Sequence, residues 1–183
     1  MELELHIVEV VPERRWNWLV EERQAGAPQQ CFFSYEDQST IVALREPGQP
    51  LRASPFVRRS SVLRLAPSTG STFTAPEQIA EWSDPVLEYR RYRLRPGTRS
   101  RFAAFLRDRT LEEQRRLGMN VHGPFDLLDE EATLIWFRGF PSLLERDRRK
   151  AAFYQGRAWV EELEEEAFSM IEDYSVILLS PVS

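Results

Sequence analysis

The sequence predicts an α+β fold made of two consecutive βαββαβ units. Two short strand-like stretches echo each other, SVLRLAP at residues 61–67 and SVILLSP at residues 175–181. Each stretch ends a series of strand and helix patterns, and these patterns follow the same order in both halves of the chain. Size is the third observation, because 183 residues with 42% hydrophobic content suffice for two small domains with packed cores.

The second half shows the clearer series of elements. A strand leads through a Pro96-Gly97 turn into a helix that Gly118 closes, and a hairpin follows. A long helical pattern begins after Pro141, and a β-branched strand ends the unit. The predicted ranges are strand 88–94, helix 102–117, hairpin strands 119–128 and 133–137, helices 142–156 and 159–170, and strand 175–179. This order is that of the ferredoxin-like split unit.

The first half repeats this order in shorter form. Its predicted elements are strand 3–10, a helix around residues 16–23, hairpin strands 30–35 and 40–45, and strand 61–67. We aligned the turn prolines that follow the first strands, and the threonines that open the second hairpin strands. The pairs that result are Glu4 with Glu88, His6 with Arg90, Val8 with Tyr92 and Arg45 with Arg138. Because the matches fall in the same order along both halves, we expect a duplication.

The two halves differ after their hairpins. Three prolines between Arg45 and Ser61 leave no room for a long second helix, so one face of the first sheet lacks cover. A short helix at 76–82 places Ile79 and Trp82 on one side and is expected to supply this cover. The expected organisation is a degenerate ferredoxin-like unit at 1–67, a linker with the short helix at 68–85, and a full ferredoxin-like domain at 86–183.

Composition excludes several classes of protein. The net charge of −5 argues against a general nucleic-acid surface, and no stretch approaches the roughly 20 apolar residues of a membrane helix. The start, Met-Glu-Leu-Glu-Leu, lacks the basic region of a signal peptide, so we expect a cytoplasmic protein. Cys31, the only cysteine, is expected to be a small buried side chain in a strand. Lys150, the only lysine, lies in a charged run that predicts an exposed helical position.

The second half resembles the NIPSNAP family over residues 86–181. The similar stretches are LEYRRYRLRPG at 87–97, WFRGFPSLLERDRRKAAF at 136–153, Trp159, and LLSP at 178–181. Domains of this family are ferredoxin-like and pair sheet to sheet as a dimeric α/β barrel. For this chain the resemblance implies an intramolecular pseudo-dimer with a cavity between its two sheets, and it implies no settled reaction. The first half resembles the family only through the internal repeat.

The first strand of the second half carries polar side chains on one face, because strand side chains alternate. These residues are Glu88, Arg90 and Tyr92. A carboxylate, a guanidinium and a phenol in a row could hold and polarise a carbonyl or enol substrate. The alternative interpretation is a structural ion pair with a tyrosine packed against it.

Trp136 and Arg138 share a face of a hairpin strand, and Phe137 lies on the face expected to meet the helices. An arginine beside a tryptophan can bind an anionic aromatic molecule, and core packing with a surface arginine is the alternative. Arg45 and His6 occupy equivalent strand positions in the first half, so we expect them to face the same cavity. Two inward arginines would favour an anionic ligand.

His122 is the better placed histidine for a general base, because it lies in a strand that ends at Gly123-Pro124. A histidine without a role is the alternative. We predict no metal site, since the two histidines lack HxH or HExxH spacing, and we predict no cofactor. The absence of GxSxG, P-loop, GxGxxG and CxxC motifs argues against hydrolase, nucleotide-binding and dithiol chemistry.

Together these observations favour a NIPSNAP-like protein of unassigned activity that binds a small anionic or aromatic molecule in the cavity between its sheets. Catalytic roles are predicted for His122, Glu88 and Tyr92, and ligand contacts for Arg90, Trp136, Arg138, Arg45 and His6. One alternative is a cofactor-free monooxygenase or isomerase of the dimeric α/β-barrel type. Another is a protein-interaction module with a filled barrel and an exposed apolar patch. We expect no nucleic-acid or membrane partner, and further homo-oligomerisation stays open.

Overall fold

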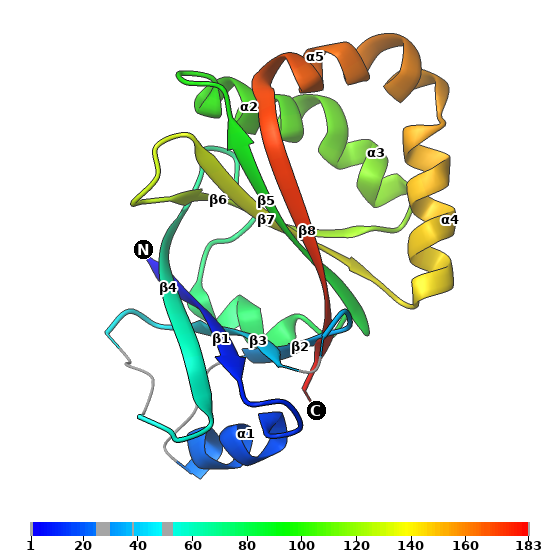
Figure 1. Cartoon of the computed structure of the whole chain (residues 1–183). Helices are drawn as coiled ribbons and strands as arrows, with labels where there is room; N and C mark the ends of the chain where they lie inside the picture. The colour runs from blue at the N-terminus through cyan, green and yellow to red at the C-terminus, as the bar shows by residue number, and fades with distance from the viewer. Residues whose placement is uncertain (1, 25–29, 38, 49–52, 183) are drawn as a thin grey trace.

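The computed structural model describes residues 2–24, 30–37, 39–48 and 53–182. In this part of the chain eight antiparallel strands close into a barrel, in the order β1-β3-β2-β8-β5-β7-β6-β4 (Figure 1). The strands are β1 (Leu3–Val10), β2 (Gln30–Ser34), β3 (Thr40–Arg45), β4 (Val57–Pro67), β5 (Val86–Leu94), β6 (Asn120–Leu127), β7 (Thr133–Phe140) and β8 (Ile171–Pro181). A mixed α/β architecture with an antiparallel sheet therefore agrees with the sequence prediction.

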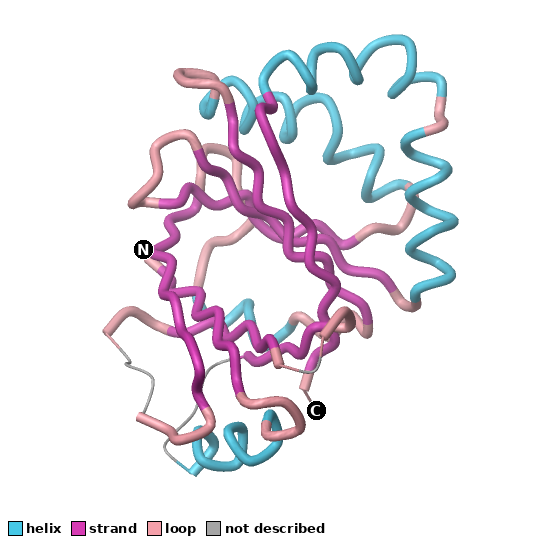
Figure 2. The backbone as a smooth tube through the Cα atoms, in the orientation of Figure 1, coloured by secondary structure: helices cyan, strands magenta, loops and turns pink. Residues whose placement is uncertain are grey.

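Helices cover the barrel unequally. Those of the second half pack together on one side, whereas a single helix, α1, lies at the opposite end (Figures 1 and 2). The helices are α1 (Arg15–Gln24), the 3-10 helix η1 (Pro76–Glu81), α2 (Arg99–Phe105), the π-helix η2 (Leu106–Thr110), α3 (Leu111–Arg116), α4 (Leu143–Tyr154), the π-helix η3 (Trp159–Leu163) and α5 (Glu164–Met170). None of the helices in the described ranges has the length and apolar character needed to span a bilayer.

The predicted elements are present, and the largest differences in their bounds are at the starts of two strands. β4 and β8 both begin four residues earlier than expected, at Val57 and Ile171. Most of the four residues added at the start of each strand are exposed and polar, so an apolar pattern could not reveal them. The predicted hairpin strand at 30–35 ends one residue earlier, at Ser34, and Cys31 is buried there as expected. Burial raises the pKa of the Cys31 thiol to about 12, so the thiol stays protonated.

Each half of the barrel has the same local strand order. In the first half this order is β4-β1-β3-β2, and in the second half it is β8-β5-β7-β6. Two short seams join the halves. At one seam β2 pairs with β8 from Phe32 opposite Pro181 to Ser34 opposite Leu179. At the other seam, the C-terminal end of β4 pairs with β6, beginning with Leu65 opposite Leu127.

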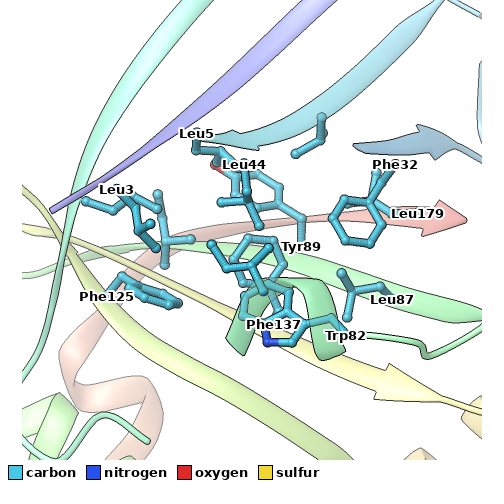
Figure 3. Close-up of a cluster of buried hydrophobic side chains, with 14 of the residues drawn as sticks. Leu3, Leu5, Phe32, Leu44, Trp82, Leu87, Tyr89, Phe125, Phe137 and Leu179 are labelled. Carbon is cyan, nitrogen blue, oxygen red and sulfur yellow. The ribbon is translucent and has the colours of Figure 1, made fainter. Parts of the chain in front are cut away.

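Apolar side chains from all parts of the sheet fill the barrel interior. Leu3 and Leu5 of β1, Phe32 of β2, Tyr89 of β5 and Phe137 of β7 all belong to one buried cluster (Figure 3). Their burial removes apolar surface from water and holds the two halves together. The expected cavity between the two sheets is therefore a packed core in this structure.

The linker at 68–85 enters the barrel instead of covering the outer face of the first sheet. Phe73, Ile79 and Trp82 are all buried in the interior cluster. The Trp82 ring lies 5.0 Å, centroid to centroid, from the ring of Phe137 (Figure 3). Our expectation of external cover was wrong, because a barrel lined with apolar groups offers the short η1 segment more apolar contact than the outer surface does.

The strand faces are also the reverse of our expectation. Leu87 and Tyr89 point into the barrel, so Glu88, Arg90 and Tyr92 lie on its outer surface beneath the helices. On β7 the interior positions are Ile135 and Phe137, which leaves Trp136 and Arg138 outside. Both faces are buried, one by the core and one by helices. Alternation therefore shows which residues share a face and leaves open which face is inner.

Candidate ligand-binding site

A cavity of about 260 Å³ lies outside the barrel, between the β5, β7 and β8 strands and the helices α2 to α5. We call it the helix-side cavity. Its apolar lining comes from Phe102, Phe105, Leu106, Trp136, Phe153, Trp159, Ala167, Phe168, Ile171, Tyr174 and Val176. Its polar lining comes from Arg90, Tyr92, Thr110, Gln114, Lys150 and Tyr154. A mostly apolar pocket with a few converging polar groups is the usual form of a small-molecule site.

The carboxylate of Glu88 is the centre of the polar wall and is fully buried. Its Oε2 accepts hydrogen bonds from Arg90 Nη1 at 2.6 Å and from Arg138 Nε and Nη2 at 3.0 and 2.8 Å. Its Oε1 accepts one from Arg146 Nε at 2.6 Å and lies 3.3 Å from Lys150 Nζ. Glu88 thus draws together strands β5 and β7 and helix α4.

This arrangement surrounds one negative charge with four positive ones. Burial alone would raise the pKa of Glu88, but Arg138 and Arg90, followed by Lys150 and Arg146, outweigh it and hold that pKa far below its usual value. Glu88 is therefore ionised, and the hydrogen bonds to both of its oxygens suit a structural counter-ion better than a proton acceptor.

Two phenols complete the polar wall. Arg90 donates to the Tyr92 hydroxyl from Nε at 3.2 Å and from Nη2 at 2.6 Å. Arg138 Nη1 donates to the Tyr154 hydroxyl at 3.3 Å and to Gln114 Oε1 at 3.2 Å. Burial raises the pKa of Tyr92. Burial would raise the pKa of Tyr154 as well, but the charges of Arg138 and Arg90 reverse that shift and lower it.

Lys150, Arg146 and Tyr154 are site residues that sequence reasoning missed. Our expectation of an exposed Lys150 was wrong, because its side chain is only 27% exposed and turns toward Glu88. Burial lowers the pKa of its ammonium group. The three residues are spaced by four along α4 and so share one helical face. That spacing, together with a carboxylate in the middle of a buried strand, is the signal that could have identified them.

His122 lies elsewhere, at the end of the barrel that the linker enters. Its Nε2 is 3.2 Å from Asp84 Oδ2, and its ring stacks on that of Trp82 with 4.4 Å between centroids. Asp84 also accepts a hydrogen bond from Asn120 Nδ2 at 2.6 Å. A second cavity, also of about 260 Å³ and bordered by Thr72, adjoins this cluster. The structure therefore does not bring His122 together with the other residues predicted to be catalytic.

His6 and Arg45 lie outside the barrel on the first half, so they do not share a cavity with Arg138. Arg45 Nη2 forms a buried ion pair with Glu22 of α1. His6 Nε2 lies 3.1 Å from Glu4 Oε2, and burial lowers the pKa of its imidazole. The reason for the difference is again the strand face, since outer residues of each half meet that half's own helices.

The residue pattern of the two halves still corresponds. Glu4 lies opposite Arg45 in the register of β1 and β3, as Glu88 lies opposite Arg138 in the register of β5 and β7.

Within the described ranges, no group of three or more histidine, cysteine, aspartate or glutamate side chains could hold a metal ion.

Fold and site together define the class of this protein, an α/β barrel with a charged cavity beneath the helices of its second half. The NIPSNAP family profile matches residues 87–183, which is more than half of the chain. The chain therefore belongs to the NIPSNAP family. No curated protein matches it significantly.

Three solved structures illustrate the likeness. A candidate monooxygenase from Lactobacillus acidophilus NCFM superposes with a TM-score of 0.70 at 11% identity, over 98% of this chain and 93% of its own. A candidate monooxygenase from Fusobacterium nucleatum gives 0.60 at 12% identity, over 100% and 92%. A NIPSNAP family protein of unknown function from Agrobacterium tumefaciens gives 0.50 at 22% identity, over 55% and 91%. At these identities the likeness shows the fold alone.

Proposed function

We propose that this NIPSNAP protein binds a small anionic molecule with a flat apolar body in the helix-side cavity. The observation that carries the proposal is the surplus of buried positive charge at one wall of an otherwise aromatic cavity. Arg90, Arg138, Arg146 and Lys150 converge on the single carboxylate of Glu88. An anion placed beside them would offset charge that burial makes costly.

The nearest additional anion does not remove this surplus. Asp147 lies 2.9 Å from Arg146 Nη1, but it is largely exposed, and its partner Arg146 is not one of the residues that line the cavity. Arg90 and Arg138 are both almost fully buried. The positive potential therefore remains on the cavity side of Glu88, where a ligand would lie.

The aromatic wall supplies the second part of the proposal. Trp136 is 2% exposed, and its indole Nε1–H has no hydrogen-bond partner among the described residues. A buried donor without an acceptor is costly, so a ligand oxygen that accepts from it would be favoured. Arg90 lies 5.0 Å from the Trp136 ring centroid, which places a cation beside a stacking surface.

The residues divide into two roles within this proposal. Arg90, Tyr92, Lys150 and Trp136 line the cavity and contact the ligand. Arg138 and Glu88 stand behind them and hold them in position. His122, His6 and Arg45 have no part in this site, although each keeps the partners described above.

Exchange of Lys150 for methionine tests the binding proposal. The variant keeps an unbranched side chain and removes one positive charge, so we expect anilinonaphthalene sulfonate, an anionic aromatic probe, to bind about 10-fold more weakly. Fluorescence titration measures the affinity. Arg148→Met is the matched control, because Arg148 lies on the same helix and is 68% exposed. Equal affinities for the two variants would contradict the proposal.

A cofactor-free oxygenase or isomerase is the second candidate function. It is favoured by the two whole-chain structural neighbours described as candidate monooxygenases and by the phenols of the cavity. Reactions of this kind begin by removing a proton from the substrate. The candidate therefore depends on a group in the cavity that can accept one.

A protein-interaction module is less well supported. The packed barrel interior agrees with it, and the helix α1 exposes Trp16 and Val20 on one face. Two exposed side chains form a small patch, whereas the second half contains a cavity with charged and aromatic walls. The cavity is therefore the better guide to function.

We further propose that residues 1–67 and 86–183 are two unequal copies of one ferredoxin-like unit, joined by the linker at 68–85. The equal strand order of the halves and the matching Glu–Arg pairs support this proposal. On this view the two copies form a pseudo-dimer within one chain, and the first copy is degenerate. Only the second copy keeps the helices that enclose a cavity.

A further inference from the structure

We infer that Tyr154 is the general base of the helix-side cavity. Its phenolate takes a proton from an acidic C–H or O–H group of a bound carbonyl or phenolic anion. This inference rests on the proposed function, since it needs a ligand in that cavity. In the step, the X–H bond of the substrate breaks and its proton moves to Tyr154 Oη. The electron pair stays on the substrate as an enolate or phenolate, so no oxidant or reductant is required.

The position of Tyr154 suits this role. The residue ends helix α4 and lines the cavity, and its hydroxyl oxygen accepts from Arg138 Nη1 at 3.3 Å. Arg138 Cζ also lies 5.6 Å from the Tyr154 ring centroid. A full positive charge thus adjoins the oxygen, and it comes from a residue that does not itself line the cavity, which leaves the cavity to a ligand.

The charged groups around Tyr154 come from three elements. β5 contributes Arg90, Glu88 and Tyr92, β7 contributes Arg138, and α4 itself contributes Lys150. Three of these five groups are cationic and one is anionic. The resulting field favours the ionised form of the phenol, in agreement with its lowered pKa.

The other possible bases of the cavity are less suitable. Glu88 is tied to four cations, and its pKa lies far below the useful range. Tyr92 accepts two hydrogen bonds from Arg90, and burial raises its pKa. Pairs of titratable groups whose surroundings separate their pKa values commonly mark acid and base roles. Here Tyr92 is the partner that keeps its proton and can donate it.

The substrate class follows from the same geometry. A carboxylate or a similar anionic group would lie against Arg90 and Lys150, and the aromatic wall would hold a flat body. The proton to be removed must then lie next to a group that can delocalise charge, such as a carbonyl. Aromatic 2-keto acids have this form, and phenylpyruvate is a suitable probe.

A spectroscopic titration tests the base directly, without any ligand. Ionisation of tyrosine is followed by near-ultraviolet absorbance as pH rises. In the wild-type protein we expect one tyrosine to ionise below the ordinary value of about 10. Tyr154→Phe should abolish this early phase, and Tyr35→Phe, which removes an exposed tyrosine of the first half, should leave it intact. Loss of the early phase in Tyr92→Phe with its retention in Tyr154→Phe would overturn the assignment.

A proton-exchange assay tests the reaction. Deuterium incorporation at the benzylic carbon of phenylpyruvate, followed by proton NMR, should fall about 100-fold in Tyr154→Phe. Tyr35→Phe, the exposed control, should keep the wild-type exchange rate. An unchanged exchange rate, or a wild-type titration without an early tyrosine, overturns the inference and leaves anion binding standing. Failure of anilinonaphthalene sulfonate to bind in the cavity, with the early tyrosine present, instead overturns the proposed function.

Discussion

The buried carboxylate of Glu88 connects strands β5 and β7 of the second half to helix α4. Arg90, Arg138, Arg146 and Lys150 all approach it, and the Glu88 side chain has no exposure to solvent. A buried ion network of this kind adds less to stability than its number of contacts suggests, because each charge loses its hydration. Removing Glu88 should destabilise the protein by more than the intact network stabilises it, because the change leaves several cations buried without a counter-ion.

Glu88→Gln should therefore destabilise the protein by about 3 to 5 kcal/mol, measured by urea unfolding at neutral pH. Glu161→Gln is the matched control, because Glu161 is 53% exposed and its ion pair is with Arg157, a surface residue four positions earlier. We expect the control to change stability by no more than about 0.5 kcal/mol. Similar losses for both variants would show that the buried network carries no special energy.

The same residue gives stability a defined pH dependence. The folded pKa of Glu88 lies below its ordinary value of 4.5, so the unfolded state binds its proton first as pH falls. The stabilisation is present above pH 4.5 and is lost below it. In urea unfolding experiments below pH 4.5, the free energy of unfolding should fall more steeply with falling pH in the wild-type protein than in Glu88→Gln.

Side-chain positions show where sequence reasoning reached its limit. It grouped Glu88, Arg90 and Tyr92 on one face, and the structure agrees with that grouping. It placed this face toward the wrong side, because β5 is buried on both faces and its pattern carries no contrast between inside and outside. It also overlooked Lys150, since a charged helical run resembles a solvated surface until a buried carboxylate is known to face it.

At the scale of elements, the linker is the least expected part of the molecule. It fills one end of the barrel through Phe73, Ile79 and Trp82. Gly139 of β7 permits this path, because a Cβ at that position would overlap the carboxyl group of Asp84. A single residue without a side chain thus allows the linker to pass closely over the strand.

Trp82→Ala should destabilise the protein by about 3 to 5 kcal/mol, since it leaves a cavity in the barrel core. Trp16→Ala is a control with the same change of side chain at a position that is 54% exposed, and its cost should stay near 1 kcal/mol or less. Thermal or urea unfolding measures both. If the linker were only a tether, the two variants would be equally stable.

Strands and helices themselves were largely predictable. β1 and β3 have the predicted bounds, and Gly118, with its positive φ, ends the helical run as expected. The position of the linker was not predictable, because the apolar side chains of Ile79 and Trp82 predict that they are buried but do not show against which surface they pack. That surface exists only after the strands of both halves have closed the barrel.

For the whole molecule, asymmetry is the main feature. Both halves contribute four strands, but only the second carries several helices over its outer face. The cavity follows from this difference, because it needs helices on one side and the sheet on the other. The family resemblance and the proposed internal repeat together indicated a barrel. Neither could locate the cavity, since its position depends on which outer face the helices cover.

The proposed pseudo-dimer predicts that one chain forms a complete barrel. Light scattering over a range of concentrations should therefore give the mass of a single chain, or of an assembly built through a surface outside the barrel seams. The first part of β4 is such a surface, because it pairs with β1 on one side and meets β6 only from Leu65 onward. A dimer held by two second-half sheets, with β2 released from β8, would refute the pseudo-dimer.

Strand β7 separates the two buried regions of the molecule and belongs to both. Phe137 faces the barrel and contacts the linker through Trp82, whereas its neighbours Trp136 and Arg138 face the helices. A shift of this strand toward one region is necessarily a shift away from the other. If the helix-side cavity binds a ligand as proposed, substitutions in the linker should change its affinity through β7, and a segment outside the matched family region would then adjust the cavity.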